Sequence, residues 1–420
     1  AVLRFRRVQR FVTLALRRRA VIATSILIVM AGVFERVTYG VSHLRSYGPV
    51  LAASSSFPFY IPTTFNSLAK RWGIEPQREP SMRVNVESMA LRYPLKPLRI
   101  EPPERRLNLV WLVSESLRYD MVDPEIMPFT HAFAQRAAWF RQHYSGGNGT
   151  RMGLFSMFYG LYGSYWFPFL ADNRGPVLMD VIIDAGYQMK MFTSARFTYP
   201  EFDRTIFARV PDKLLYEGDA QPKWRRDREN VDLILKFIAE RDPARPFMTF
   251  MFFDGPHANY YFPKENIIRR PYAEDLNYAT MDLEKDIELI KNRYINACNH
   301  LDGQIRRVVE YLEEQQLLDS TIVIITGDHG EEFMEKGRWG HNSEFHEEQV
   351  RPPLVLWVPG REPIQITHMT SHLDLPATLM PLLGVKNPPE DYSLGRDLFS
   401  PIGREYTIIA GWDDVAYVSP

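Results

Sequence analysis

Two short segments place carboxylates and a histidine directly after apolar runs. Glu115 follows the run Leu109–Val113, and Asp328 and His329 follow the run Thr321–Thr326. Such runs are typical of buried parallel strands, and ligands bind beyond the carboxyl ends of strands in open α/β sheets. Taken alone, Glu115 could be a solvated or capping carboxylate. Taken alone, the Asp-His pair could form an ordinary hydrogen bond within a loop. Together they favour a divalent metal ion such as Zn²⁺, Mn²⁺ or Mg²⁺.

A glycine-rich turn, GGNGT at residues 146–150, precedes a helical stretch at Arg151–Gly160. Such a turn presents free backbone N–H groups and the positive end of the helix dipole to an anion. Thr150 is expected at the N-cap, where its hydroxyl would ordinarily cap the helix. A neighbouring cation would instead make it a nucleophile that attacks phosphorus. The sequence leaves both interpretations open.

Two histidines lie in loops that follow these elements. His257 occurs in FFDGPHANYYFP, and His341 occurs in RWGHNSEFH together with His346. Either loop can bring an imidazole to a transferring group, to neutralise its oxygens or to protonate a leaving group. Isolated loop histidines are usually surface residues, which is the competing interpretation. Five other histidines are interpreted as structural: His131, His143, His300, His368 and His372.

Apolar runs and helical patterns alternate along the chain. The expected strands are Leu109–Val113, Met189–Thr193, Phe247–Phe253, Thr321–Thr326 and Pro353–Val358. The expected helices are Met127–Ala138, Arg151–Gly160, Val177–Ala185, Val231–Glu240 and Asp282–Gln316. This alternation predicts an α/β fold with a mainly parallel central sheet.

The charge distribution singles out the start of the chain. The 420 residues have a net charge of −1, but seven arginines and no acid lie within residues 1–19, so removing those seven charges leaves −8 for the rest. A basic block fits nucleic acid or a membrane face. The uncharged run Ala20–Phe34 that follows favours a membrane helix with its N-terminus in the cytoplasm, against a buried helix or a cleaved signal peptide. No nucleic-acid partner is expected.

Three parts are expected along the chain: a basic segment and membrane helix at 1–40, a juxtamembrane arm and linker at 41–105, and a catalytic domain at 106–420. The arm is rich in proline and is expected to hold short helices. The first residue is Ala, so we expect further membrane segments upstream. Cys298 is the one cysteine, which rules out an intrachain disulfide and a thiolate metal cluster.

Several motifs together resemble a known family. NLVWLVSESLR, GGNGTRMGLF, ITGDHGEEF, RPPLVLWVPG and TSHLDLPATLMPLLGV occur in this order. They are similar to the sulfatase-like branch of the alkaline phosphatase superfamily, which includes lipoteichoic acid synthases, phosphoethanolamine transferases and YejM-type inner-membrane proteins. The WGHNSEF loop and the arm FPFYIPTTFNSLAKRWG resemble the YejM type most. The resemblance implies an alkaline phosphatase-like sheet with helices on both faces.

The resemblance also implies roles for individual residues. The matching metal-binding set is Glu115, Thr150, Asp328 and His329, with Thr150 also the nucleophile. His257 and His341 match histidines that contact the transferred group. The Cys/Ser-x-Pro-x-Arg signature of true sulfatases is absent, which argues against sulfate-ester hydrolysis. The disulfide-forming cysteines of many phosphoethanolamine transferases are also missing.

The resemblance implies a metal-dependent phosphoryl-transfer enzyme, either a phosphatase or a phosphoglycerol- or phosphoethanolamine-type transferase. Its substrate would be a membrane lipid or envelope glycan phosphate, and its catalytic domain would lie in the periplasm, anchored to the bacterial inner membrane. The alternative is a YejM-like regulatory, lipid-binding protein of lipopolysaccharide homeostasis with little turnover. Either function leaves room for a membrane protein partner.

Overall fold

The computed structural model describes the chain except for residue 1 and the segments 46–49, 51–64, 66–90 and 278–280. The chain divides into two units, Ala1–Val86 and Glu87–Pro420. The second unit contains the sheet and all the candidate site residues. The division into parts at residues 40 and 105 stays a prediction.

The centre of the second unit is an eight-stranded sheet in the order β10-β2-β9-β6-β1-β5-β3-β4. All neighbouring strands pair in parallel except at β9, which is antiparallel to both of its neighbours. The predicted, mainly parallel sheet is therefore confirmed. The strands of this sheet are β1 (Asn108–Ser114), β2 (Ala138–Tyr144), β3 (Gln188–Thr193), β4 (Leu215–Glu217), β5 (Phe247–Phe253), β6 (Thr321–Gly327), β9 (Leu354–Trp357) and β10 (Ile364–Ser371).

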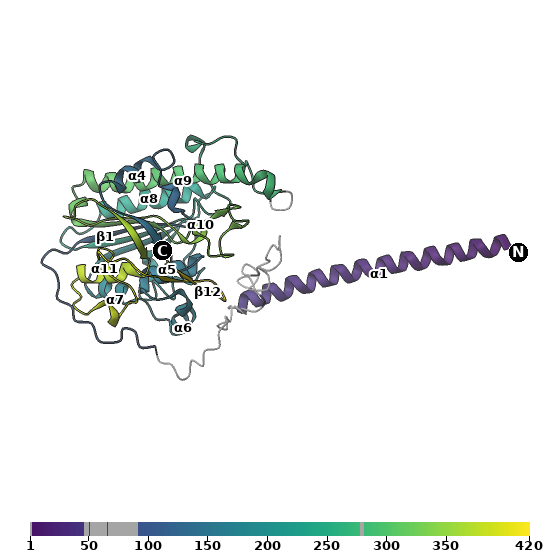
Figure 1. Cartoon of the computed structure of the whole chain (residues 1–420), viewed down its shortest axis with the longest axis horizontal. Coiled ribbons are helices and arrows are strands. Elements are labelled where there is room, and N and C mark those ends of the chain that lie inside the picture. The colour runs from purple at the N-terminus through teal and green to yellow at the C-terminus, as the bar shows by residue number, and fades with distance from the viewer. Residues whose placement is uncertain (1, 46–49, 51–64, 66–90, 278–280) are drawn as a thin grey trace. The chain divides into compact units, whose positions relative to one another are not determined.

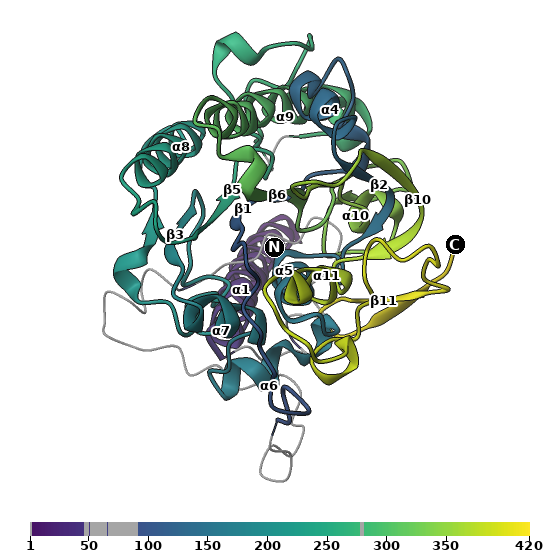
Figure 2. The same cartoon turned by 90° about the vertical axis from the view of Figure 1, so that its left-hand side faces the viewer.

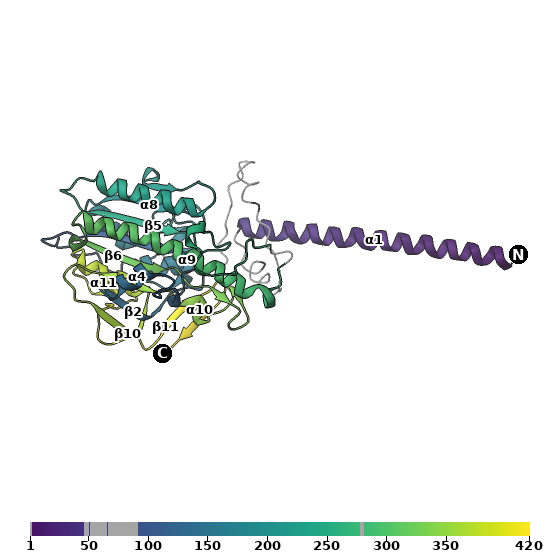
Figure 3. The ribbon, with the colours of Figure 1, turned by 90° about the horizontal axis from the view of Figure 1, so that it is seen from above.

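Alternating side chains along the buried strands explain why helices cover both faces of the sheet. On β1, Leu109, Trp111 and Val113 enter one hydrophobic core, whereas Val110 and Leu112 enter the other. Helices α5, α6, α7 and α11 pack on the first core and α4, α8 and α9 on the second, as Figures 1 and 2 show. Seen from above in Figure 3, α8 and α9 lie over β5 and β6. The expectation of helices on both faces is confirmed.

The helices of this unit are α4 (Pro128–Ala134), α5 (Thr150–Tyr159), α6 (Trp166–Ala171), α7 (Val177–Asp184), α8 (Trp224–Ala239), α9 (Leu283–Glu314), α10 (Glu347–Val350) and α11 (Asp374–Leu382). Two small antiparallel pairs complete it: β7 (Glu332–Phe333) with β8 (Trp339–Gly340), and β11 (Thr407–Ala410) with β12 (Val415–Val418).

Two predicted helices have different bounds in the structure. The expected helix Met127–Ala138 ends at Ala134, because the following residues enter the β-strand β2. Helix α8 begins at Trp224, seven residues before the predicted start, since its first two turns are charged and carry no apolar pattern. Strands β2 and β10 were missed because each mixes exposed and buried residues.

The first unit contains helix α1, Val2–Arg45. Its segment Ala20–Leu44 has a mean hydropathy of 1.9 in its most apolar window, none of which is buried, so it is long and apolar enough to cross a membrane. Twenty-five helical residues rise about 37 Å, more than the roughly 30 Å of a bilayer core. The buried-helix alternative predicts a mostly buried window, which the described residues do not show. The predicted short helices of the arm lie outside the described residues.

The last residues before β1 pack on the sheet unit. The backbone N–H of Leu95 donates to Asp391 at 2.7 Å, and the hydroxyl of Tyr93 donates to the Tyr159 carbonyl at 3.1 Å. The Tyr93 ring also contacts Phe169 at a centroid distance of 5.1 Å. This end of the linker is therefore fixed to the helices that carry the site.

A chain of neutral groups lies beneath the β6 turn. His372 Nε2 lies 3.1 Å from the Gly327 carbonyl, His143 Nε2 lies 2.8 Å from His372 Nδ1, and Thr370 Oγ1 lies 3.0 Å from His143 Nδ1. With both imidazoles neutral, one assignment of protons satisfies all three bonds: Thr370 donates to His143, His143 donates to His372, and His372 donates to the Gly327 carbonyl. Burial lowers the pKa of His143 well below its usual value and that of His372 to about 3.

These buried neutral histidines predict that the protein is less stable in acid. Below pH 6.5 the histidines of the unfolded chain bind protons, whereas the buried imidazoles of the folded protein stay neutral. The free energy of unfolding therefore falls as the pH falls. Between pH 7 and pH 4.5, His372 alone should lower the free energy of unfolding by roughly 3 kcal/mol. Denaturation of the full chain in detergent at both pH values measures this drop. The drop should shrink in His372→Gln and persist in His368→Gln; an equal drop in both variants would refute the assignment.

Candidate active site

Three neighbouring parallel strands bring three carboxylates to one edge of the sheet. Ser114 at the end of β1 is level with the last residues of β5 and β6. The residues that follow these strand ends are Glu115, Asp254 and Asp328. All three are buried, with 8%, 3% and 0% of their surface exposed. The strand register alone therefore gathers three acidic groups in one place.

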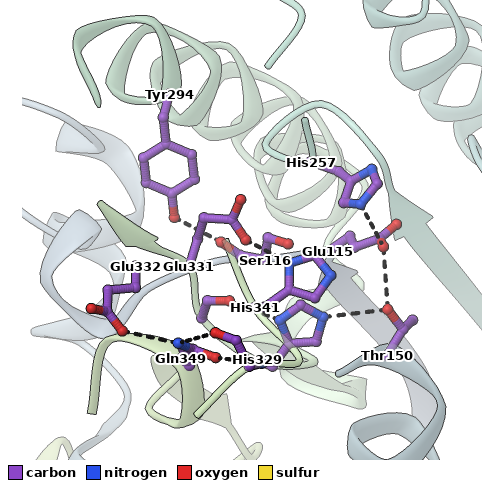
Figure 4. A network of polar contacts seen from close by, with 12 residues as sticks. Glu115, Ser116, Thr150, His257, Tyr294, His329, Glu331, Glu332, His341 and Gln349 are labelled. Atoms are coloured by element: carbon purple, nitrogen blue, oxygen red, sulfur yellow. Dashed lines mark hydrogen bonds and ion pairs between the residues drawn. The ribbon is translucent and has the colours of Figure 1, made fainter. Parts of the chain in front are cut away.

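The hydroxyl of Thr150 faces this cluster. It donates to Glu115 Oε1 at 3.2 Å and lies 3.3 Å from His329 Nε2, as Figure 4 shows. Gly149, not Thr150, is the N-cap of α5, and no side chain caps the helix. The expected N-cap position is thus wrong by one residue, and the plain-cap interpretation of the hydroxyl fails. Thr150 is the first helical residue, with its hydroxyl directed at the acids.

Close packing explains the glycine before Thr150. A Cβ atom on Gly149 would lie 1.8 Å from Asn342 Oδ1, so a larger residue there would displace the Asn342 side chain. The backbone N–H of Asn342 donates to the Asn148 carbonyl at 2.9 Å. The turn that carries Thr150 is therefore held against the loop that carries His341.

Asp328 and His329 are oriented by the backbone. Asp328 Oδ1 accepts N–H bonds from Ser116 at 3.0 Å and from His329 at 2.9 Å, whereas the buried Oδ2 accepts no hydrogen bond from the described residues. His329 Nδ1 lies 2.8 Å from the Gly330 carbonyl, which leaves Nε2 with a lone pair toward Thr150. Burial lowers the pKa of His329 well below its usual value and raises that of Asp328 to about 7.

Glu115 lies between the two other acids. Burial, followed by repulsion from Asp254 and Asp328, raises its pKa well above the usual range. His257 Nε2 lies 3.4 Å from Glu115 Oε1, and His257 Nδ1 lies 3.6 Å from Asp254 Oδ1. Burial lowers the pKa of His257, so this imidazole is neutral at pH 7. The ionised forms of these carboxylates therefore repel one another in a buried place.

His341 is held by a buried carboxylate. Its Nδ1 lies 2.6 Å from Glu331 Oε2, and the Tyr260 hydroxyl donates to the other oxygen of Glu331 at 2.6 Å. Burial opposes a charge on His341, but Glu331 outweighs burial and raises the pKa of the imidazole. His346 instead contacts Glu332 at 2.8 Å.

The predicted set has the donor types of a metal site, and three pairs of its ligand atoms have the spacing of one. With bonds of about 2.0–2.2 Å and tetrahedral angles, neighbouring ligand atoms lie about 3.3–3.6 Å apart. The contacts of Thr150 are 3.2 and 3.3 Å, and Asp328 Oδ2 lies 3.4 Å from His329 Nε2. The buried Asp328 Oδ2 has no donor of its own among the described residues. A divalent cation fits this set because it would supply the missing positive charge.

Other residues could share the ion or hold a second one. The ligand atoms of Glu115, His329 and His341 all lie within 4.8 Å of one another, and so do those of Glu115, Asp254 and His257. Glu115 belongs to both groups, so its carboxylate is the shared element of any arrangement.

Two residues of the site were missed from the sequence. Asp254 directly follows the predicted strand Phe247–Phe253, and the rule that singled out Glu115 and Asp328 would have found it. Lys223 Nζ contacts Asp254 Oδ2 at 2.7 Å. No local pattern marks Lys223, because its position depends on how α8 packs against the sheet.

The cluster opens into a cavity of about 530 Å³. Thr150, His257 and His341 line one part of it, and Trp412 and Tyr199 line another. This volume is typical of a small-molecule site. Four of the six predicted residues thus line one pocket, and His329 and Asp328 adjoin them through the contacts of Thr150 and His329.

Comparison with known proteins defines the class. The sulfatase family model matches residues 107–385, and the chain belongs to this family. A protein of the alkaline phosphatase superfamily from Vibrio parahaemolyticus has the same fold, with a TM-score of 0.59, 17% identity and coverage of 77% of this chain and 78% of that one. The C-terminal periplasmic domain of EptC from Escherichia coli, solved in complex with zinc, also has this fold. Its TM-score is 0.58 and its identity 17%, and the match covers 77% of this chain and 94% of that domain.

Within the family, the chain is similar to the inner membrane protein YejM of Salmonella typhimurium. The two are 25% identical over 401 residues, which cover 92% of this chain and 62% of YejM. The chain thus spans less than two thirds of that relative's length. The resemblance to the superfamily and to YejM-type proteins is confirmed.

Removing the charge of Glu115 should lower the amount of metal that the protein binds. Glu115→Gln removes a charge from both possible ligand groups, so we expect the bound metal to fall at least tenfold. Elemental analysis of the purified full chain, dialysed against buffered Zn²⁺, measures the occupancy. Glu362→Gln, an exposed matched control, should keep the parent's content. Equal metal in parent and Glu115→Gln would contradict the site.

Proposed function

We propose that the chain is a metal-dependent phosphoryl-transfer enzyme with Thr150 as its nucleophile. The observation that carries the proposal is the Thr150 hydroxyl, which lies 3.2 Å from Glu115 Oε1 and 3.3 Å from His329 Nε2 at the wall of a cavity. A helix start, a buried carboxylate and a neutral imidazole meet there at one hydroxyl. This arrangement suits the activation of an alcohol.

A divalent ion bound by Glu115, Thr150, Asp328 and His329 would supply Lewis acidity, which lowers the pKa of a coordinated hydroxyl. Glu115 accepts the hydrogen bond from Thr150 and is placed to receive its proton. The threonine oxygen forms a bond to phosphorus as the bond from phosphorus to the leaving alcohol breaks. The product of this step is a phosphothreonine.

The histidines handle charge and protons. Glu331 raises the pKa of His341 and so favours its protonated form, which would stabilise the phosphoryl oxygens and protonate the departing alcohol. His257 is neutral and offers a hydrogen bond to the same oxygens. Water or an acceptor hydroxyl then attacks phosphorus, the bond to Thr150 breaks, and the threonine regains its proton.

The substrate we propose is a phosphate of an envelope lipid or glycan. Support comes from the candidate membrane helix Ala20–Leu44 and from the similarity to an inner membrane protein. The catalytic unit would then lie in the periplasm, on the side opposite the basic N-terminal segment. The periplasmic domain of EptC, which shares the fold, supports the same placement.

Thr150→Ala tests the mechanism. Without the nucleophile, hydrolysis of 4-nitrophenyl phosphate and of bis-(4-nitrophenyl) phosphate by the full chain should fall roughly a thousandfold or more. Thr367→Ala, at an exposed position, should retain the parent rate. Mass spectrometry after a rapid acid quench should find phosphate on Thr150 in the parent. Full activity in Thr150→Ala would refute the nucleophile.

A regulatory, lipid-binding role is the second candidate, and the match to YejM over 92% of the chain favours it. The same variant separates the two functions in cells that depend on the protein. If catalysis is the function, Thr150→Ala should fail to complement. Complementation by Thr150→Ala at normal expression would support the regulatory role.

A further inference from the structure

The lining of the cavity is rich in cations. Arg151, Arg196, Lys223 and Arg226 line the cavity, against the carboxylates Glu115 and Asp254. Two of these cations have acidic partners, since Lys223 contacts Asp254 at 2.7 Å and Arg151 contacts Glu201 at 3.0 Å. Within the described part of the chain, neither Arg196 nor Arg226 forms an ion pair.

Arg226 is held in place without being neutralised. Its Nε donates to the Ala220 carbonyl at 2.9 Å and its Nη1 to the Ser194 carbonyl at 3.2 Å. Carbonyl oxygens fix the plane of the guanidinium but leave its full positive charge. Arg226 is thus a preoriented cation at the wall of the cavity.

Arg196 is exposed, and its neighbours fix the loop that carries it. The backbone N–H of Ala195 donates to Thr193 Oγ1 at 3.0 Å, and that of Phe197 donates to Glu217 Oε1 at 2.7 Å. Phe197 is buried, with 2% of its surface exposed. The loop therefore holds a second arginine beside Arg226, which contacts the same loop at Ser194.

An aromatic surface lies on the same cavity wall. The Arg151 guanidinium carbon lies 4.6 Å from the ring centroid of Trp412 and 5.7 Å from that of Tyr199. Both rings line the cavity. One phosphoryl group at Thr150 would fill only a small part of 530 Å³, so this wall is available to the rest of a substrate.

We propose that Arg196 and Arg226 bind a second anionic group of the substrate, while its first phosphoryl group lies at Thr150. The substrate class is an organic phosphate that carries a further phosphate or carboxylate on its alcohol portion. This inference rests on the proposed function, because it assumes that Thr150 marks the reacting end. Arginine suits the task, since its planar fork pairs with either kind of oxyanion in a bidentate manner.

Binding of non-hydrolysable phosphonates tests the proposal without turnover. The probes are benzylphosphonate, 4-(phosphonomethyl)benzoate and p-xylylenebisphosphonate, titrated calorimetrically into the metal-loaded full chain in detergent. A charge-assisted pair is worth about tenfold in affinity. We therefore expect one or both doubly anionic probes to bind about tenfold more tightly than benzylphosphonate, and the tighter of the two identifies carboxylate or phosphate as the preferred group.

The variants locate this preference. In Arg196→Gln/Arg226→Gln, the ratio of affinities should fall below about twofold. Arg196→Gln alone should lower it as well, and this exposed substitution guards against a folding defect of the double variant. Arg245→Gln is the matched control. Arg245 lies just before β5, at the amino-terminal ends of the strands and thus at the opposite end from the site, and it contacts the Gly186 carbonyl. The control should keep the parent's ratio.

The outcomes separate the two proposals. Tight but equal binding of all three probes by the parent overturns the second anion site and leaves the proposed function standing. A tenfold preference that survives in Arg196→Gln and in the double variant also overturns the assignment. If no phosphonate binds, the phosphoryl site itself fails, and the inference fails with it.

Discussion

The site depends on negative charge that the sheet concentrates in a buried place. Strands β1, β5 and β6 end level with one another. The strand register therefore brings Glu115, Asp254 and Asp328 together although their carboxylates repel one another. Burial raises the pKa of Glu115 and Asp328 and makes their ionised forms costly. A bound cation would resolve this conflict, and in the proposed mechanism the same cation activates Thr150. Stability and chemistry of the site thus have one physical origin.

Much of this arrangement could be predicted from the sequence. The apolar runs that became β1 and β6 are buried on both faces, so they are recognisable without tertiary information. The rule that ligands bind beyond the carboxyl ends of parallel strands then selected Glu115, Asp328 and His329. The helix expected over Asp282–Gln316 closely matches α9 because its apolar spacing extends over many turns. Local patterns suffice where burial is complete.

The features of the site that the sequence did not predict depend on contacts between distant segments of the chain. Lys223 and Arg226 reach the cavity only because α8 begins earlier than its apolar pattern indicates. The chemical role of His341 depends on Glu331, which looks like any acid in a charged loop. Thr150 was placed at the N-cap because threonine is favoured there, whereas Gly149 is the N-cap and Thr150 is the first helical residue. Such shifts follow from packing, which a single sequence does not reveal.

Anomalous X-ray diffraction at the zinc edge, on crystals of the zinc-loaded protein, tests the central claim most directly. The account predicts a peak about 2 Å from Glu115, Asp328 and His329, with the Thr150 oxygen among the ligands. A strong peak elsewhere, or a peak in this cluster with the Thr150 hydroxyl turned away from it, would contradict the account.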